Sequence, residues 1–361
     1  MDCLLVVGEG INISFTNQYK YHIKDVIAVM QVKKNLYAND MDSSYQNLRS
    51  VIDVSEPRDG EEFMSHLQRD AYKLLMSKEL PKREKLSLLT DRENIIYHFL
   101  LMEAFHPLRI VIGYYGYKDE LSLREGFVNK LEEKVKTGPT KGYSPGSFPN
   151  LYICGDYSII KTNGMPFGSP FLKRDFYWPL LLTSNKNPIN NLLELIWTRL
   201  SYKFKIGSSI FGDDFQLDAF HPLLFCKERK MNNDNWGWEY SYNNIPKELL
   251  DKPLTPLEWK PLEVSRNQFI LLNLLLKLGE VDYENDKKFK DLINRENIDL
   301  KKLIEELENE RIIYCEDNKI KLLTDELLVI EFKGKIYAGE NKSGEMTHFV
   351  NKIQSQVNLD L

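Results

Sequence analysis

The chain has 361 residues, 42% of them hydrophobic and 28% charged, which is typical of a folded globular protein with one large or two moderate domains. The formal net charge of −5 excludes the overall basic field that attracts nucleic acid, although a local basic face is compatible with it. No apolar run reaches the roughly 18–20 residues of a membrane span, and MDCLLVVGEG lacks the basic segment of a signal peptide, so we expect a cytoplasmic protein without membrane contact.

Strands and helices are expected to alternate through the first two-thirds of the chain, which indicates an α/β fold. Residues 3–7 predict a short strand, with residues 11–15 as its possible partner. Apolar, β-branched runs predict four further strands, at 26–33, 109–116, 151–160 and 178–184. Apolar residues recur at helical spacing in five segments, 43–52, 60–77, 91–103, 119–136 and 187–204.

The texture of the sequence changes at residues 226–261, which are polar, rich in aromatic residues and bear prolines. We expect a linker there that packs on something, because its tryptophans are unsuited to a free coil. Residues 262–361 then predict three helices (266–278, 286–295 and 298–311) and two hairpins, around Asn318 and Gly334. Three helices followed by a hairpin are the pattern of a winged helix-turn-helix. The expected organisation is therefore a domain at 1–225, the linker, and a winged helix-like domain.

The segment VIAVMQVKKNLY (26–37) places an amide and an ammonium group on a predicted buried strand. Gln31 and Lys33 are two residues apart, so their side chains point to the same face of that strand. The preceding strand begins next to a carboxylate, Asp2. A metal-dependent phosphodiesterase needs oxygen ligands for a hard divalent cation and a positive charge near the scissile phosphate. Asp2, Gln31 and Lys33 supply both.

This arrangement resembles the PD-(D/E)XK nuclease superfamily, in which an aspartate and a (Glu/Asp/Gln)-x-Lys segment lie on adjacent strands. VIAVMQVKKNLY, followed by a helix with NLRSV, is further similar to an uncharacterised prokaryotic nuclease-like domain family. Its members read as a hydrophobic strand, Glu-Val-Lys, and a helix with a Leu-Arg-Ser segment. LYICGDYSII and NPINNLLELIWTRL resemble the end of that family, so the likeness covers about residues 1–225.

The resemblance implies a restriction-endonuclease-like mixed sheet flanked by helices, with Mg²⁺ as cofactor and Mn²⁺ able to replace it. Asp2 and Gln31 would hold the metal, and Lys33 would be the catalytic lysine. Two features depart from the family: Gln31 stands where glutamate is usual, which removes a negative charge, and the family places a helix before the aspartate, whereas Asp2 is the second residue here. Glu9 and Asp25 are weaker alternatives to Asp2.

Simpler structural roles compete with each functional assignment. Gln31 and Lys33 are alternatively solvated residues at a strand end. Lys34, Tyr37 and Arg49 are candidate contacts to a nucleic acid backbone, with packing or helix capping as the alternative. The six histidines do not cluster in the sequence, and two of them, His106 and His221, precede prolines and are expected in turns.

The C-terminal domain is a poor candidate for reading DNA bases. Its third predicted helix, within DLKKLIEELENER (299–311), holds five acidic and three basic residues, which argues against insertion into a groove. Lys301 and Lys302 gather at the start of this helix, where contact with a phosphate remains open. We expect a surface for protein interaction or dimerisation instead.

Together these patterns favour a Mg²⁺-dependent endonuclease that cleaves DNA, or RNA, joined to a winged helix. The resemblance implies a role in prokaryotic restriction or antiphage defence, with a homo-oligomer or a defence-system protein as partner through the winged helix. Two alternatives remain, a nuclease fold that binds without cutting and a winged-helix DNA-binding regulator.

Overall fold

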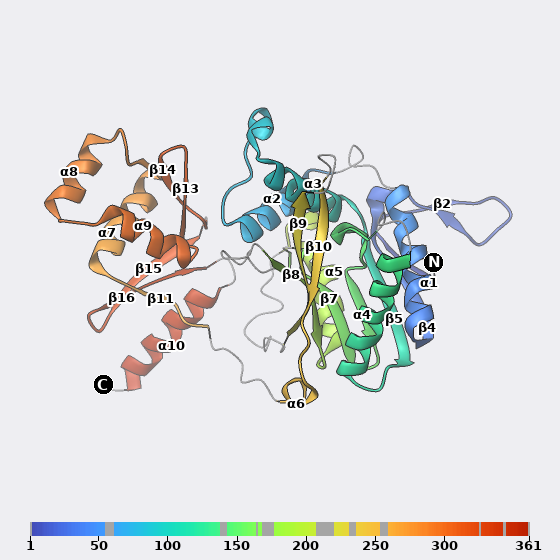
Figure 1. The fold of residues 1–361 in the computed structure, drawn as a ribbon. Coiled ribbons are helices and arrows are strands. Elements are labelled where there is room, and N and C mark those ends of the chain that lie inside the picture. Colours follow the sequence, from blue (N-terminus) through green and yellow to red (C-terminus); the bar gives the residue numbers. More distant parts are fainter. Residues whose placement is uncertain are drawn as a thin grey trace. The chain divides into compact units, whose positions relative to one another are not determined.

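The computed structural model describes residues 2–54, 61–137, 143–163, 165–167, 177–206, 220–230, 236–252, 259–324, 326–341 and 344–359. The chain divides into two compact units, one formed mainly by residues up to 256 and the other mainly by residues 257–361 (Figure 1). No helix in the described ranges combines the length and apolar character that crossing a membrane requires.

The first unit is built on a mixed sheet, in which the described residues form eight strands in the order β1-β4-β5-β6-β7-β8-β9-β10. β4, β5 and β6 run parallel to one another, and the other neighbouring pairs are antiparallel. The strands are β1 (Cys3–Val6), β4 (Val26–Leu36), β5 (Leu108–Gly116), β6 (Leu151–Cys154), β7 (Tyr157–Lys161), β8 (Trp178–Ser184), β9 (His221–Lys230) and β10 (Trp236–Tyr242).

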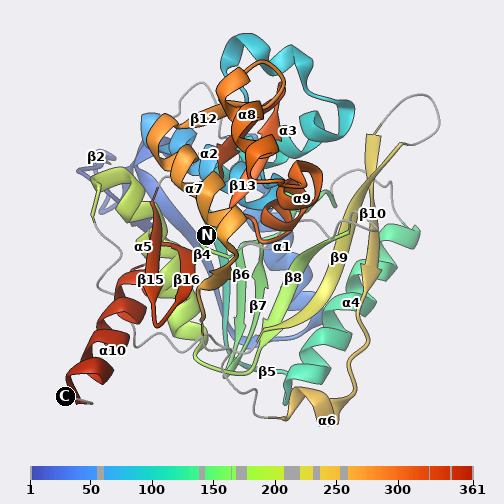
Figure 2. The same cartoon turned by 90° about the vertical axis from the view of Figure 1, so that its left-hand side faces the viewer.

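Helices cover both faces of this sheet, so the α/β class and the flanked mixed sheet are as expected. Four helices share one core with the sheet, α1 (Ala38–Asp53), α2 (Glu62–Met76), α3 (Asp91–Phe105) and α4 (Glu120–Thr137). α5 (Pro188–Phe204) shares a second core with the sheet. Figure 2 shows strands β6 to β9 between α5 and α4. A short helix, α6 (Lys247–Leu250), follows β10.

β4 is buried on both faces of the sheet. Val29 belongs to the core shared with α1, and the adjacent Ala28 belongs to the core shared with α5. This explains why its sequence is continuously apolar instead of alternating. β1 pairs antiparallel with β4, and β5 lies parallel on the other side of it.

The prediction of a linker at 226–261 is wrong for residues 226–242. Most of the segment from 226 to 242 belongs to β9 and β10, which pair antiparallel from Trp236 opposite Lys230 to Tyr242 opposite Leu224. The polar and charged residues that suggested a linker belong to strands at the end of the sheet, where Arg229, Lys230, Ser241 and Tyr242 are exposed and most of the other described residues are half-buried.

Two smaller predictions also need correction. Residues 151–160 form two strands instead of one, because the chain turns at Gly155, whose φ of 58° suits a residue without a Cβ. Residues 11–15 do not pair with the first strand. Instead β2 (Ile11–Asn12) pairs with β3 (Tyr19–Lys20) in a separate hairpin that precedes a short 3-10 helix at Ile23–Asp25.

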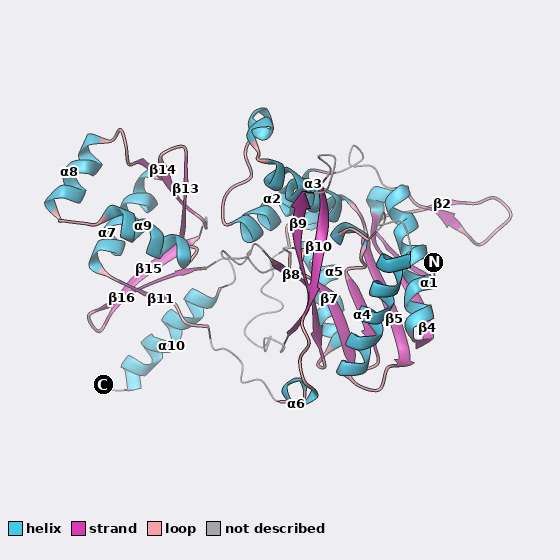
Figure 3. Cartoon of the chain, viewed as in Figure 1, coloured by secondary structure: helices cyan, strands magenta, loops and turns pink. Residues whose placement is uncertain are grey.

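The second unit contains the three predicted helices and both predicted hairpins (Figure 3). The helices are α7 (Arg266–Leu278), α8 (Lys287–Arg295) and α9 (Leu300–Asn309). A sheet in the order β12-β14-β13 contains β12 (Glu280–Asp282), β13 (Ile313–Glu316) and β14 (Lys319–Leu322). A sheet in the order β11-β16-β15 contains β11 (Leu262–Val264), β15 (Leu327–Phe332) and β16 (Lys335–Glu340), and α10 (Glu345–Leu359) follows it.

Candidate functional site

Asp2 and Gln31 are in direct contact across the β1–β4 pair. The backbone N–H of Asp2 donates to the Met30 carbonyl at 3.1 Å, which anchors Asp2 to β4 immediately before β1 begins. The Gln31 side-chain amide donates to Oδ2 of Asp2, and the Val32 backbone N–H donates to the same oxygen at 2.7 Å. The Asp2 carboxylate thus accepts the Val32 N–H of β4 in place of a backbone carbonyl of a neighbouring strand.

Gln31 is a buried amide, 4% exposed, held between two elements. On one side it donates to Asp2, and on the other its Oε1 accepts from Nδ2 of Asn47 at 3.2 Å. Asn47 is an exposed residue of α1, the helix that packs on the face of the sheet to which Gln31 points. The contact with Asn47 was not expected from the sequence, because nothing in it shows which turn of α1 lies over Gln31.

Lys33 lies two residues beyond Gln31 on β4 and is half-buried. Strand geometry directs its side chain to the same face as that of Gln31. Within the described ranges, no hydrogen bond or ion pair involves its ammonium group. An ammonium group held on a strand without an anionic partner is available to an anionic ligand.

The structure places the other predicted contacts of this unit at the end of β4 and on α1. Lys34 is exposed. Tyr37 is 51% exposed and is the N-cap of α1, where its backbone N–H donates to Asp40 at 3.2 Å. Its ring meets that of Tyr117 edge-on, with centroids 5.7 Å apart. Arg49 is half-buried on α1. Capping and packing therefore account for Tyr37, while Lys34 stays open to a ligand.

Asp2 offers one carboxylate oxygen to a divalent cation, whereas Gln31 would offer its amide oxygen only after a half-turn of the amide, because here its N–H faces Asp2. Asp2 is exposed, and its second oxygen, Oδ1, has no partner in the described part of the chain. Mg²⁺ takes oxygen ligands and keeps several of its waters, and one or two carboxylates together with the phosphates of the substrate commonly bind it. No group of three or more His, Cys, Asp or Glu side chains in the described ranges is arranged to hold a metal. Among the described residues, the hydrogen-bond partners of the Gln31 side chain are Asp2 and Asn47, and not the weaker alternatives Glu9 and Asp25.

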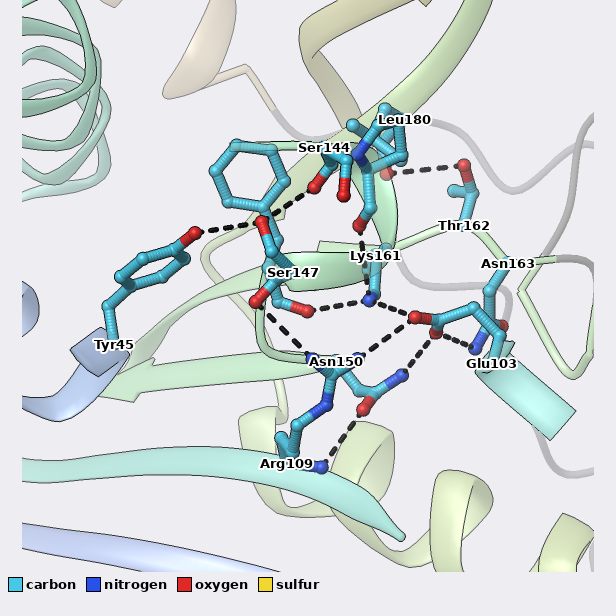
Figure 4. A network of polar contacts seen from close by, with 12 residues as sticks. Tyr45, Glu103, Arg109, Ser144, Ser147, Asn150, Lys161, Thr162, Asn163 and Leu180 are labelled. Carbon is cyan, nitrogen blue, oxygen red and sulfur yellow. Dashed lines mark hydrogen bonds and ion pairs between the residues drawn. The ribbon is translucent and has the colours of Figure 1, made fainter. Parts of the chain in front are cut away.

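A buried charged network was missed by the sequence reasoning (Figure 4). Glu103 of α3, 4% exposed, accepts from Lys161 at 2.6 Å, and from Arg109, Asn150 and Asn163 at 2.9 Å each. Burial raises the pKa of Glu103, but the Lys161 ammonium and the Arg109 guanidinium outweigh it, so the pKa lies below its ordinary value. The sequence signal was a charged residue inside an apolar run, in LLMEAF and in YSIIK.

The network joins distant parts of the chain around the loop before β6. Lys161 also donates to the Phe148 carbonyl at 2.6 Å, and Arg109 donates to the Ser147 carbonyl at 3.3 Å. Tyr45 of α1 donates to the Ser147 hydroxyl at 2.8 Å. These bonds satisfy buried polar groups of an irregular segment, which is a structural task. We therefore assign the network to stability and not to catalysis.

A second buried pair joins α4 to β9. Glu120, 3% exposed, lies 2.9 Å from Nδ1 of His221 and accepts from the Thr183 hydroxyl at 2.5 Å. Arg124 donates to Thr183 at 2.6 Å and to the carbonyl of Asn243 at 2.7 Å. The expectation that His221 lies in a turn is wrong, because it is the first residue of β9. These contacts tie α4 to the strands at the far end of the sheet.

Acid is expected to destabilise the first unit through His106. This side chain is 2% exposed, and burial, with Arg109 nearby, lowers its pKa to about 4. Between that value and about 6.5, the unfolded chain binds a proton that the folded chain does not, so stability is lost as the pH falls through this window. The loss reaches about 3 kcal/mol, from about 1.4 kcal/mol per pKa unit. Urea unfolding of wild type and His106→Phe between pH 4 and 8 checks this: the variant should show the weaker pH dependence, and identical pH profiles would contradict the prediction.

Comparison with known proteins adds no assignment: no family model, no curated protein and no solved structure matches this chain.

Proposed function

We propose that the first unit is a metal-dependent nuclease of the PD-(D/E)XK type that hydrolyses phosphodiester bonds, with DNA as the favoured substrate and RNA as the alternative. The observation that carries the proposal is the contact between Asp2 and Gln31 across two paired strands, with Lys33 two residues farther along the same face. It agrees with the aspartate and Gln-x-Lys pattern on adjacent strands that the sequence resemblance implies. The role in antiphage defence rests on that resemblance alone.

Each residue has a defined task in this proposal. Asp2 and Gln31 would hold Mg²⁺ through their side-chain oxygens, Gln31 after a half-turn of its amide, and Mn²⁺ would replace it. When bound, the metal supplies positive charge that acidifies the attacking water and offsets the charge of the phosphate. Lys33 supports a negative charge that develops on the attacking water or on a phosphate oxygen. Because Gln31 is neutral, this site carries one negative charge fewer than a site with glutamate, and we expect correspondingly weaker metal binding.

A second candidate function, nucleic acid binding without cleavage, is favoured by one observation. In this structure Gln31 presents its N–H, and not its oxygen, to the Asp2 carboxylate. An N–H donor is no metal ligand, so this arrangement is complete without a cation. A nuclease fold that has lost its metal would still offer Lys33 and Lys34 to a phosphate backbone.

We further propose that the second unit is a winged helix-like module for interaction, either with a second copy of the chain or with a defence-system protein. α7, α8 and α9 followed by strands support this interpretation. Lys301 and Lys302 are both exposed at the start of α9, and Lys302 lies 3.9 Å from Glu306 in the next turn. This acidic neighbour reduces the attraction of the helix start for phosphate, which favours a protein partner over DNA.

The test is a cleavage assay of the full chain on plasmid, single-stranded DNA and RNA, with Mg²⁺ or Mn²⁺ or with a chelator. We expect wild type to cut only with metal and Asp2→Asn to be inactive, since the amide keeps the shape of the carboxylate but loses its charge. Glu9→Gln is the matched control, because it removes an exposed carboxylate of the same segment that lies outside the site.

The outcomes separate the two candidates. Equal cutting by wild type and Asp2→Asn would refute the assignment of the site. Absence of cutting by wild type, together with metal-independent binding of the same nucleic acids in a gel-shift assay, would replace the nuclease with the binding protein.

A further inference from the structure

The side chains of Asn47, Gln31 and Asp2 form a hydrogen-bonded chain with a direction. Nδ2 of Asn47 donates to Oε1 of Gln31 at 3.2 Å, and Nε2 of Gln31 donates to Oδ2 of Asp2. Both of these donated hydrogen bonds therefore run toward Asp2. In this direction the buried amide stabilises the carboxylate and offers it no oxygen for sharing a cation.

The same chain can run in the opposite direction. A half-turn of the Gln31 amide would place its oxygen beside Asp2 and its NH₂ group toward Asn47, and Asn47 would then have to present its oxygen. Asn and Gln amides carry both donors and acceptors, so the pair can make either arrangement. Two oxygens facing each other beside Asp2 repel, however, unless a cation lies between them.

We infer that Asn47 is a positioning residue that sets which atom of Gln31 faces Asp2 and thereby governs divalent metal binding. The inference rests on the proposed function and deepens it, because it explains how glutamine serves where glutamate is usual. Without metal, the donor direction is preferred. A cation selects the oxygen direction and must offset the cost of reversing both amides, which lowers its apparent affinity.

The positions of the two amides make the inference testable. Gln31 is buried, whereas Asn47 is exposed on α1 and is replaceable without opening the core. Asn47→Asp leaves only acceptors at position 47, so it should hold the Gln31 NH₂ group and turn the Gln31 oxygen toward Asp2. Added negative charge alone also attracts cations, and therefore needs its own control. Gln46→Glu supplies that control, since it adds the same charge at the adjacent exposed position of α1.

The experiment measures the Mn²⁺ dissociation constant of the full chain by calorimetry. We expect Asn47→Asp to bind Mn²⁺ at least about tenfold more tightly than wild type, which corresponds to about 1.4 kcal/mol. Gln46→Glu should change the Mn²⁺ dissociation constant by less than half of the factor expected for Asn47→Asp. Gln31→Glu removes the amide and with it any direction to set, so adding Asn47→Asp to Gln31→Glu should give no gain, or a loss through repulsion between the two carboxylates.

The outcomes distinguish the inference from the proposed function. If wild type binds Mn²⁺ and Asn47→Asp gains no more than Gln46→Glu, or gains equally beside Gln31→Glu, the role of Asn47 is refuted and the metal site stands. If only Asn47→Asp binds Mn²⁺, the inference is supported, and the donor direction is what keeps wild type metal-free. If neither binds, both the metal site and the role of Asn47 are refuted. As a readout independent of affinity, the Gln31 side-chain amide signals in a ¹⁵N NMR spectrum should shift on addition of Mg²⁺.

Discussion

Lys33→Ala is expected to lower the rate of metal-dependent cleavage by about a hundredfold to a thousandfold. This is the usual effect of removing one group that stabilises charge in the transition state. The ammonium group of Lys33 has no anionic partner among the described residues and follows Gln31 on the same face of β4. Its loss should reduce the rate of cutting while nucleic acid and Mn²⁺ still bind. Single-turnover cleavage kinetics, with urea unfolding to check the fold, measure this effect.

Lys34→Ala is the matched control for Lys33→Ala. It removes the same charge one residue farther along β4, from a side chain that strand geometry directs to the opposite face. Lys34 is exposed, so this variant should keep most of its cleavage rate and lose, at most, some affinity for nucleic acid. Similar losses of rate in the two variants would mean that the lysines act only through general attraction to phosphate, and Lys33 would then lose its assigned role.

The sequence predicts the central strands well, because burial on both faces leaves a clear apolar run. The expected strand at 26–33 is the core of β4, and RIVIGYYG at 109–116 lies in β5. The error at residues 226–242 has the opposite cause. β9 and β10 end the sheet, and their charged residues give them the composition of a linker. Arg229 and Lys230 are exposed there, whereas the Glu228 side chain is only 7% exposed and pairs with Arg92 at 2.5 Å.

The site is predictable only in part, for a geometric reason. Sequence spacing places Gln31 and Lys33 on one face of a strand, and the resemblance directs attention to Asp2 as their partner. Spacing holds no information on which residue of the following helix lies over Gln31, and so Asn47 could not be found. The direction of the Gln31 amide depends on that contact as well. The buried network around Glu103 escapes for the same reason, since Lys161 is 58 residues away in the sequence.

Glu103→Gln is expected to destabilise the first unit by about 3–5 kcal/mol, the typical cost of removing one partner from a buried ion pair. Glu103 is the carboxylate that faces the buried cations Lys161, Arg109 and Arg199, so its neutralisation leaves their charges uncompensated. The guanidinium of Arg199 donates its hydrogen bonds to the backbone carbonyls of Ala104 and Glu103 near the end of α3. Arg199 therefore needs the Glu103 side chain only for its negative charge. Urea unfolding followed by circular dichroism measures the effect.

Lys161→Met should cost less than Glu103→Gln, because Arg109 still pairs with Glu103 at 2.9 Å after the ammonium group is removed. Burial, partly offset by Glu103, lowers the pKa of Lys161 to about 7. Between pH values of about 7 and about 10.4, Lys161 binds a proton in the unfolded chain but not in the folded chain. The stability of wild type should therefore increase as the pH rises through this window. Lys161→Met lacks this gain. A larger loss in Lys161→Met than in Glu103→Gln would show that the carboxylate does not hold this cluster of cations together. Equal pH dependence in wild type and Lys161→Met would contradict the lowered pKa of Lys161.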